Sequence, residues 1–241
     1  MKKVFIYIGI VATALISCDD NYQDPYKIKE VKNLSTQNSN DDKAIAEYLD
    51  THYLDEQGKI QTFLSTTPDD DDNKKLSELQ PKTLASGVIV IVREGAQPSP
   101  GKEIGTTDVI SIMQRTYAYL SDGEDGAAFH TPYPFANTVD GAGTPDKDPA
   151  YYYAKPSVLE SSSKTKDYYE IEGFQEGLKE FKSFAKDDSE LYNLQGVIIV
   201  PSRAAFARDT HFPYQGLNWR NRNFVFNFQI YNTKERAANE K

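Results

Sequence analysis

Hydrophobic and polar positions change pattern several times along the chain, and the first change lies at the amino terminus. An apolar run at residues 4–16 follows two lysines, and Ser17 and Cys18 come directly after it. A short basic start, an apolar stretch of this length and small residues before a cleavage point are typical of a secretory signal peptide. Because the run is shorter than the ~20 residues of a membrane-spanning helix, we expect residues 1–17 to be removed.

Residues 18–40 are polar and carry few apolar anchors, which is typical of a flexible tether. A helical repeat follows, and Asn40 or Asp41 could cap its first turn. The repeat forms one stripe of an amphipathic helix: Ile45, Tyr48, Leu49, His52 and Tyr53. We expect His52 to pack on this stripe rather than bind a ligand. The helix begins an N-terminal helical extension at residues 41–85.

The extension contains four consecutive aspartates at residues 69–72. A calcium loop interleaves its carboxylates with carbonyls and a turn glycine, and this run has no such order. We therefore interpret it as a solvated acidic loop between the helix and the main body.

From Gly87 onward the pattern predicts strands. Residues 88–92 are consecutive β-branched residues and predict a buried strand, while 107–120 and 194–200 predict two more. The last strand, at 224–230, alternates, so its apolar residues should share one face: Phe224, Phe226, Phe228 and Ile230.

The stretch 131–168 has no regular period and is rich in Pro, Gly, Asp, Ser and Tyr, so we interpret it as an insertion or extended loop. Its tyrosine clusters, at 151–153 and 168–169, form either a binding surface or, as we favour, a flap packed on the domain. A short helix follows, because apolar residues recur at i, i+4 and i+7: Phe174, Leu178 and Phe181. Strands around one short helix predict an α+β half-barrel, and residues 233–241 form a charged tail.

Composition narrows the chemistry. The chain of 241 residues has 27 Lys+Arg against 36 Asp+Glu, a formal net charge of −9, which argues against a nucleic-acid partner. One cysteine excludes an intrachain disulfide framework and any Cys-clustered metal site. With no histidine cluster or recognisable catalytic triad in the sequence, we expect no cofactor and no metal.

The residues around the cysteine resemble a known motif. Leu15-Ile16-Ser17-Cys18 resembles the lipobox of bacterial lipoproteins, and Asp19-Asp20 resembles the acidic start of Bacteroidetes lipoproteins sent to the outer membrane. The resemblance implies a lipidated Cys18 that holds the mature chain to the cell envelope, on the periplasmic side or at the cell surface. The alternatives are a buried thiol at Cys18 and a solvated acidic tether after it.

The carboxyl-terminal half resembles the FKBP-type peptidyl-prolyl cis-trans isomerases. The resemblance rests on three stretches in order: Ile171-Glu172-Gly173-Phe174, then Pro201-Ser202-Arg203-Ala204-Ala205-Phe206, then the strand at 223–230. It implies an FKBP-like domain at 86–232, interrupted by the insertion at about 131–168, with an antiparallel half-barrel sheet wrapped around one short helix. The preceding helix resembles that of Bacteroidetes lipoprotein isomerases.

The resemblance also implies a site. Its aromatic walls and floor would be Phe129, Phe174, Phe206 and Phe226, and Ile171 would supply a side chain and a backbone N–H. His130 stands where the family has an aspartate, so it is either a polar rim group that titrates near neutral pH or only the start of a loop. The alternative for the four phenylalanines is ordinary core.

His211 lies in a segment that resembles the family's flap over the pocket, and Tyr214 and Trp219 lie nearby. For the histidine and the tryptophan we expect loop packing; the alternative for Trp219 is an exposed aromatic contact for a peptide or sugar.

Three functions follow from these residues. The first is a lipid-anchored isomerase that acts on proline-containing polypeptide clients, exported or outer-membrane proteins; a dry aromatic cup favours the twisted X-Pro amide, whose rotation barrier is ~18–20 kcal/mol. The second is a non-catalytic module of the same fold that binds peptides or assists envelope assembly. The third is a surface glycan-binding lipoprotein, suggested by the acidic tether and the tyrosine-rich insertion.

Overall fold

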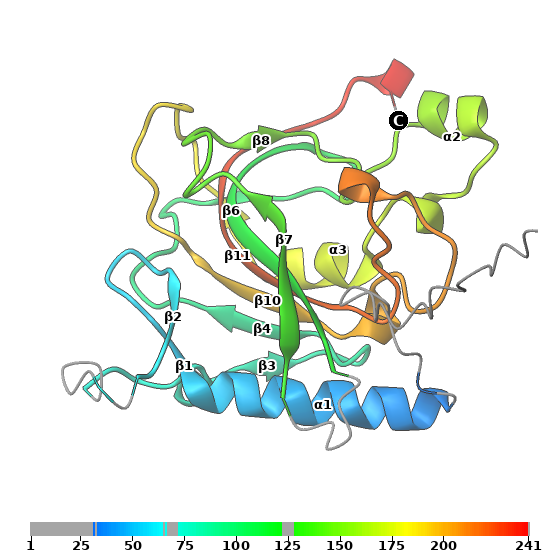
Figure 1. Ribbon diagram of the computed structural model, residues 1–241. Coiled ribbons are helices and arrows are strands. Elements are labelled where there is room, and N and C mark those ends of the chain that lie inside the picture. Colours follow the sequence, from blue (N-terminus) through cyan, green and yellow to red (C-terminus); the bar gives the residue numbers. More distant parts are fainter. Residues whose placement is uncertain (1–30, 32, 65, 67–71, 122–127, 241) are drawn as a thin grey trace, which may run out of the picture.

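The computed structural model describes residue 31 and residues 33–64, 66, 72–121 and 128–240 (Figure 1). The expected signal peptide, Cys18, most of the expected tether and most of the aspartate run lie outside these residues. Within the described part of the chain, no helix has the length and apolar character needed to cross a membrane.

The centre of the molecule is a seven-stranded antiparallel sheet, so the predicted α+β class with antiparallel strands is confirmed. Its strands lie in this order, with β8 (Asp146–Lys147) paired to β6: β3 (Lys82–Thr83), β4 (Ile89–Val92), β10 (Gly196–Val200), β11 (Asn223–Lys234), β6 (Val109–Leu120) and β7 (His130–Asn137). A separate small pair joins β5 (Lys102–Glu103) to β9 (Lys182–Ser183).

The helix α3 (Glu172–Leu178) lies inside the curve of this sheet (Figure 1). It packs there because Phe224, Phe226 and Phe228 of β11 all face it, as their alternation predicts. The approach is close: a Cβ added to Gly173 would lie 2.5 Å from Cγ1 of Val200. Glycine is therefore required at this position for the helix to lie against the sheet.

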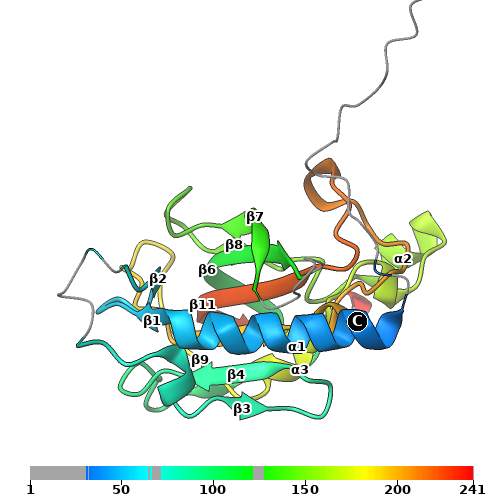
Figure 2. The same ribbon diagram turned by 60° about the horizontal axis from the view of Figure 1, so that its bottom comes forward.

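The opposite face of the sheet is covered by α1 (Leu34–Thr51) and by the hairpin of β1 (His52–Leu54) and β2 (Ile60–Thr62) (Figure 2). A second apolar cluster fills this interface: Ile45, Tyr48, Leu49, Ile60, Leu76, Ile89, Ile91, Val197, Ile199 and Val225. The extension is thus part of the packed body, and it contains strands besides its helix.

The predicted start of α1 is wrong. Asn33 caps the helix, because its side-chain oxygen accepts a hydrogen bond from the backbone N–H of Ser35 at 2.9 Å, so the expected tether is shorter than 18–40. Asp41 lies inside the helix and is buried. The helical stripe also ends earlier than predicted, since His52 begins β1.

Most of the predicted insertion at 131–168 is ordered structure. It holds β7, β8 and α2 (Pro156–Ser162), and its residues 151–153 are buried in the main core. The periodicity of β7 is obscured by two prolines, which lack the N–H that a central strand needs, and β7 is accordingly an edge strand. The tyrosines at 151–153 are therefore core residues and offer no exposed binding surface.

The charged tail at 233–241 is likewise attached to the body. The strand β11 continues to Lys234, past a register shift after Ile230. Arg236 is buried, with its guanidinium 4.3 Å from the ring centroid of Tyr153 and its Nη1 2.8 Å from Oδ2 of Asp148. The charged residues of this segment predicted a tail outside the domain, but the charge of the buried Arg236 is paired with that of Asp148, so the segment packs on the body.

Candidate functional site

The fold brings Ile171, Phe174, Phe206 and Phe226 into one cluster. The rings of Phe174 and Phe226 are stacked, with centroids 4.2 Å apart. Ile171 is the N-cap residue of α3, and Phe206 follows the 3₁₀ turn η4 (Ser202–Ala204). These side chains are 0–2% exposed, so the predicted aromatic walls have converged without forming an open cup.

Rings from other segments cover this cluster. Phe135 of β7 lies edge-on to Phe224 and Trp219, at centroid distances of 5.0 and 5.1 Å. Tyr151 contacts both Phe174, at 5.8 Å, and Phe226, at 6.0 Å. The space that the resemblance assigns to a proline ring is therefore filled by the chain's own aromatic side chains.

The backbone donor assigned to the site is also in use. The N–H of Ile171 donates a hydrogen bond to the carbonyl oxygen of Tyr151 at 2.8 Å. Tyr151 thus supplies both a ring in the aromatic cluster and a carbonyl on the N–H that the resemblance assigns to a bound peptide.

Several hydrogen bonds fix the segment 149–154 in this position. The N–H of Ala154 donates to Oε1 of the buried Glu170 at 2.8 Å, and the hydroxyl of Tyr152 donates to the carbonyl of Gly105 at 2.6 Å. Nε2 of Gln114 donates to the hydroxyl of Tyr151 at 2.5 Å. Burial raises the pKa of Tyr151, so its hydroxyl stays protonated.

Phe129 does not join the predicted cup. It lies in the cluster on the opposite face of the sheet, stacked on Tyr119 at 4.9 Å and 5.4 Å from the ring of Tyr48. The inward place is taken by Phe135, because a register shift between His130 and Tyr133 puts it on the other face of the strand from Phe129. A bulge re-aims side chains, and its register is not visible in the sequence pattern.

His130 is the first residue of β7, paired with Leu120, and it is half-buried. Its Nδ1 lies 3.1 Å from the hydroxyl of Thr131. It therefore begins β7 directly after the displaced Phe129.

The loop at 207–222 closes the cluster from the side. His211 is held between two backbone groups: its Nε2 accepts a hydrogen bond from the N–H of Trp219 at 2.8 Å, and its Nδ1 lies 3.0 Å from the carbonyl of Asp209. Its ring stacks on Phe206 at 4.5 Å, and burial lowers its pKa. Trp219 is buried, so the expected loop packing is confirmed and an exposed aromatic contact is excluded.

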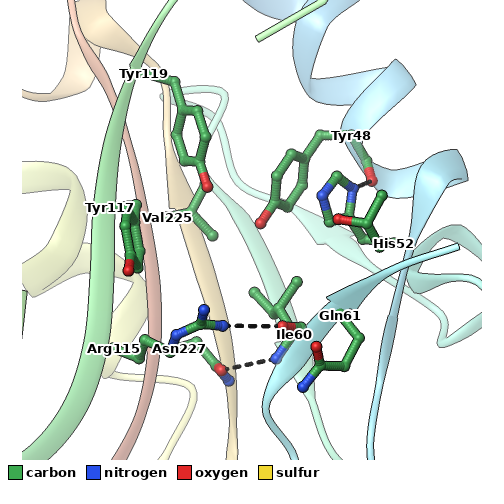
Figure 3. A pocket seen from close by; sticks show the side chains of 10 residues that line it. Tyr48, His52, Ile60, Gln61, Arg115, Tyr117, Tyr119, Val225 and Asn227 are labelled. Atoms are coloured by element: carbon green, nitrogen blue, oxygen red, sulfur yellow. Dashed lines mark hydrogen bonds between the residues drawn. The ribbon is translucent and has the colours of Figure 1, made fainter. Parts of the chain in front are cut away.

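An open hollow lies on the other face of the sheet, between α1, β2 and β6 (Figure 3). Its volume is about 220 Å³, and its lining includes three tyrosines and one arginine: Tyr48, Tyr117, Tyr119 and Arg115. Sequence reasoning missed this hollow. The available signal was the alternation of Arg115, Tyr117 and Tyr119, which places the three side chains on one face of a strand.

Comparisons with known proteins leave the family open. No protein-family model and no curated protein matches the chain. Among solved structures, FkpA from Escherichia coli matches with 20% identity and a TM-score of 0.37 over 64% of this chain, which spans about half, 51%, of that protein. A peptidyl-prolyl cis-trans isomerase from Pseudomonas syringae pv. tomato matches with 14% identity and a TM-score of 0.34, over 64% of this chain and 81% of that one. TM-scores below 0.5 assign neither a fold family nor an activity.

Proposed function

We propose that this chain is an FKBP-like module of the cell envelope that assists the assembly or folding of envelope proteins without turning over X-Pro bonds. The fold assignment is supported by the antiparallel sheet around α3 and by the gathering of Ile171, Phe174 and Phe226 beneath it. The second function set out from the sequence is thus preferred to the first.

One observation carries the absence of turnover: Tyr151 occupies the cup. Its carbonyl takes the N–H of Ile171, and its ring lies against Phe174 and Phe226. Catalysis of X-Pro rotation requires a site that holds the twisted amide better than the planar one. A substrate proline would first have to displace a buried, hydrogen-bonded segment.

Isomerase activity is the second candidate, and a specific observation favours it. Ile171, Phe174, Phe206 and Phe226 converge in one cluster although they come from separate segments. An enzyme of this kind needs no nucleophile or metal, because a dry aromatic cup and a backbone donor suffice to orient the peptide. In this reading the segment 149–154 moves aside when a client binds.

A proline-isomerisation assay on a short X-Pro peptide separates the two candidates. We expect the wild-type chain to leave the peptide isomerising at its uncatalysed rate, with a relaxation time of tens of seconds or longer. Catalysis that disappears in Phe226→Leu and persists in the control Phe212→Leu, a half-exposed ring outside the cluster, would establish the isomerase instead.

The envelope location rests on the sequence motif at Cys18. Several acyl chains hold a protein to a membrane far better than one chain does. Mass spectrometry of the chain from a cell-envelope fraction should give an acylated Cys18, and Cys18→Ser should release the protein from the membrane. An unmodified cysteine in a soluble wild-type chain would contradict the anchor.

A further inference from the structure

The hollow between α1 and the sheet has the features of a small anion site. Its walls are the rings of Tyr48, Tyr117 and Tyr119, and Val225 and Ile60 contribute apolar surface. Figure 3 shows the hydroxyls of Tyr48 and Tyr119 and the guanidinium of Arg115 facing the same space. A volume of about 220 Å³ lies below the ~300–1,000 Å³ of drug-sized sites, so the occupant is a single small ring or a group of similar size.

The charge of the residues that line the hollow favours an anionic ligand. The chain as a whole carries a formal net charge of −9, yet Arg115 lines the hollow and no aspartate or glutamate does. Nη1 of Arg115 donates to the carbonyl of Ile60 at 3.1 Å, which holds the guanidinium at the edge of the space. Asp140 pairs with it from outside, Nε to Oδ2 at 3.0 Å, but that carboxylate is 47% exposed and its attraction is weakened by water.

The two hydroxyls add a neutral donor. Burial raises the pKa of both Tyr48 and Tyr119, so both remain protonated phenols. A hydrogen bond between them further raises the pKa of Tyr48 and opposes the rise for Tyr119, so Tyr48 donates to Tyr119 and the Tyr119 hydroxyl is the one that can donate to an anion. Their rings are held from behind by Phe129, which contacts both. The residue expected in the proline cup therefore braces this second site.

We propose that this hollow binds a carboxylate joined to one planar ring, with the carboxylate between Arg115 and the hydroxyl of Tyr119. The ring lies against the tyrosine faces, where stacked or edge-on aromatic contacts are favourable. The carboxylate takes charge-assisted hydrogen bonds from the guanidinium, which are stronger than those between neutral groups. Two sources offer this chemistry: a free aromatic acid, and a peptide that ends in an aromatic residue.

Titrations of the full chain, followed by amide chemical shifts in NMR spectra, test the site. The probes are phenylacetate, N-acetylphenylalanine and the neutral N-acetylphenylalanine amide. We expect the acids to shift the amides of residues 48, 61 and 117, and the amide probe to bind at least about tenfold more weakly, because it lacks the charged hydrogen bonds. Tighter binding of N-acetylphenylalanine than of phenylacetate points to a peptide carboxyl terminus, and the reverse order to a free acid.

Three variants separate the site from general charge effects. Arg115→Gln should weaken acid binding at least about tenfold, whereas Lys179→Gln, which removes one exposed charge at the C-cap of α3, should leave it unchanged. Tyr119→Phe keeps the ring and should still weaken binding, which covers the case in which Arg115→Gln fails to fold. Equal binding of the acid and the amide probe, or an unchanged affinity in a folded Arg115→Gln chain, would overturn the proposal.

Discussion

The carbonyl oxygen of Tyr151 accepts the N–H of Ile171 at 2.8 Å, and the Tyr151 ring lies 5.8 Å from that of Phe174. One residue therefore meets the backbone donor and the aromatic floor at the same time. A peptide bound in an FKBP-like cup would need these same two contacts. In the proposed function, the segment 149–154 is therefore an internal occupant of the cup.

Shortening Tyr151 should open the cup. Tyr151→Val removes a ring beside Phe174 and Phe226, and we expect the cavity to lower the free energy of unfolding by about 3–5 kcal/mol. The same variant should gain binding of a short X-Pro peptide, seen as shifts of the Phe174 and Phe226 amides. The half-exposed Tyr168→Val is the matched control and should change neither quantity. A folded Tyr151→Val chain that does not bind the peptide would contradict the proposal that Tyr151 occupies a peptide-binding cup.

Asp41 should be a stability determinant. Its buried carboxylate accepts hydrogen bonds from Gln37 Nε2 at 2.9 Å and from Ser202 Oγ at 2.5 Å, and thus joins α1 to the end of β10. Asn223 Nδ2 donates to it as well, at 3.0 Å. Asp41→Asn places an NH₂ group among donors, and we expect a loss of about 2–4 kcal/mol in urea unfolding.

The neighbouring Asp42 is the control for this measurement. Its side chain is 57% exposed and pairs with Arg203 at the surface, so Asp42→Asn should change stability by about 0.5 kcal/mol or less. Equal effects of the two substitutions would show that the buried hydrogen bonds of Asp41 contribute no more to stability than the surface pair of Asp42.

Stability should fall in mild acid through His211. Burial lowers the pKa of His211 in the folded chain below its usual ~6.5, so the unfolded chain binds more protons in that range. Stability is then complete above about pH 6.5 and declines as the pH falls below that value. Protonation of Nε2 also removes the acceptor for the Trp219 N–H.

Urea unfolding at pH 5 and pH 7.5 measures this effect. The pKa of His52 is lowered too, so the wild-type chain contains both contributions. We expect His211→Gln to reduce the difference between the two pH values without abolishing it. An unchanged difference would assign the acid sensitivity to other groups.

Gly173→Ala should destabilise the domain although alanine favours helices by about 1 kcal/mol. The new Cβ would lie 2.5 Å from Cγ1 of Val200 and 2.8 Å from the backbone oxygen of Ala204. A backbone atom cannot move aside without distorting the chain around it, so we expect the free energy of unfolding to fall by about 1–3 kcal/mol. Thermal unfolding beside the exposed Glu172→Ala gives the comparison, and a rise in Tm for Gly173→Ala would contradict the close packing.

Local pattern predicted much of the scaffold. The β-branched run at 88–92, the alternation at 224–230 and the spacing of Phe174 and Leu178 gave β4, β11 and α3. These elements are recoverable because each buries a face whose period is set by its own backbone. The start of α1 escaped prediction because its first turns are polar and depend on the Asn33 cap and on Asp41 burying its charge against Ser202.

The sequence by itself determined four strands of the central sheet, at 88–92, 107–120, 194–200 and 224–230, together with the short helix and the set of aromatic residues available for a cup. Only the tertiary structure decided which rings share a face. Phe129 and Phe135 are an even number of residues apart, which would place both on one face of a regular strand. A register shift between the pairs Leu120–His130 and Ala118–Tyr133 lies between them, so Phe135 faces the cluster while Phe129 packs against Tyr119 on the other side. A shift of one residue in strand register exchanges the two faces of a sheet. Phe135 therefore joins Tyr151 in covering the predicted cup, while Tyr48, Arg115 and Tyr119 line the open hollow on the other face.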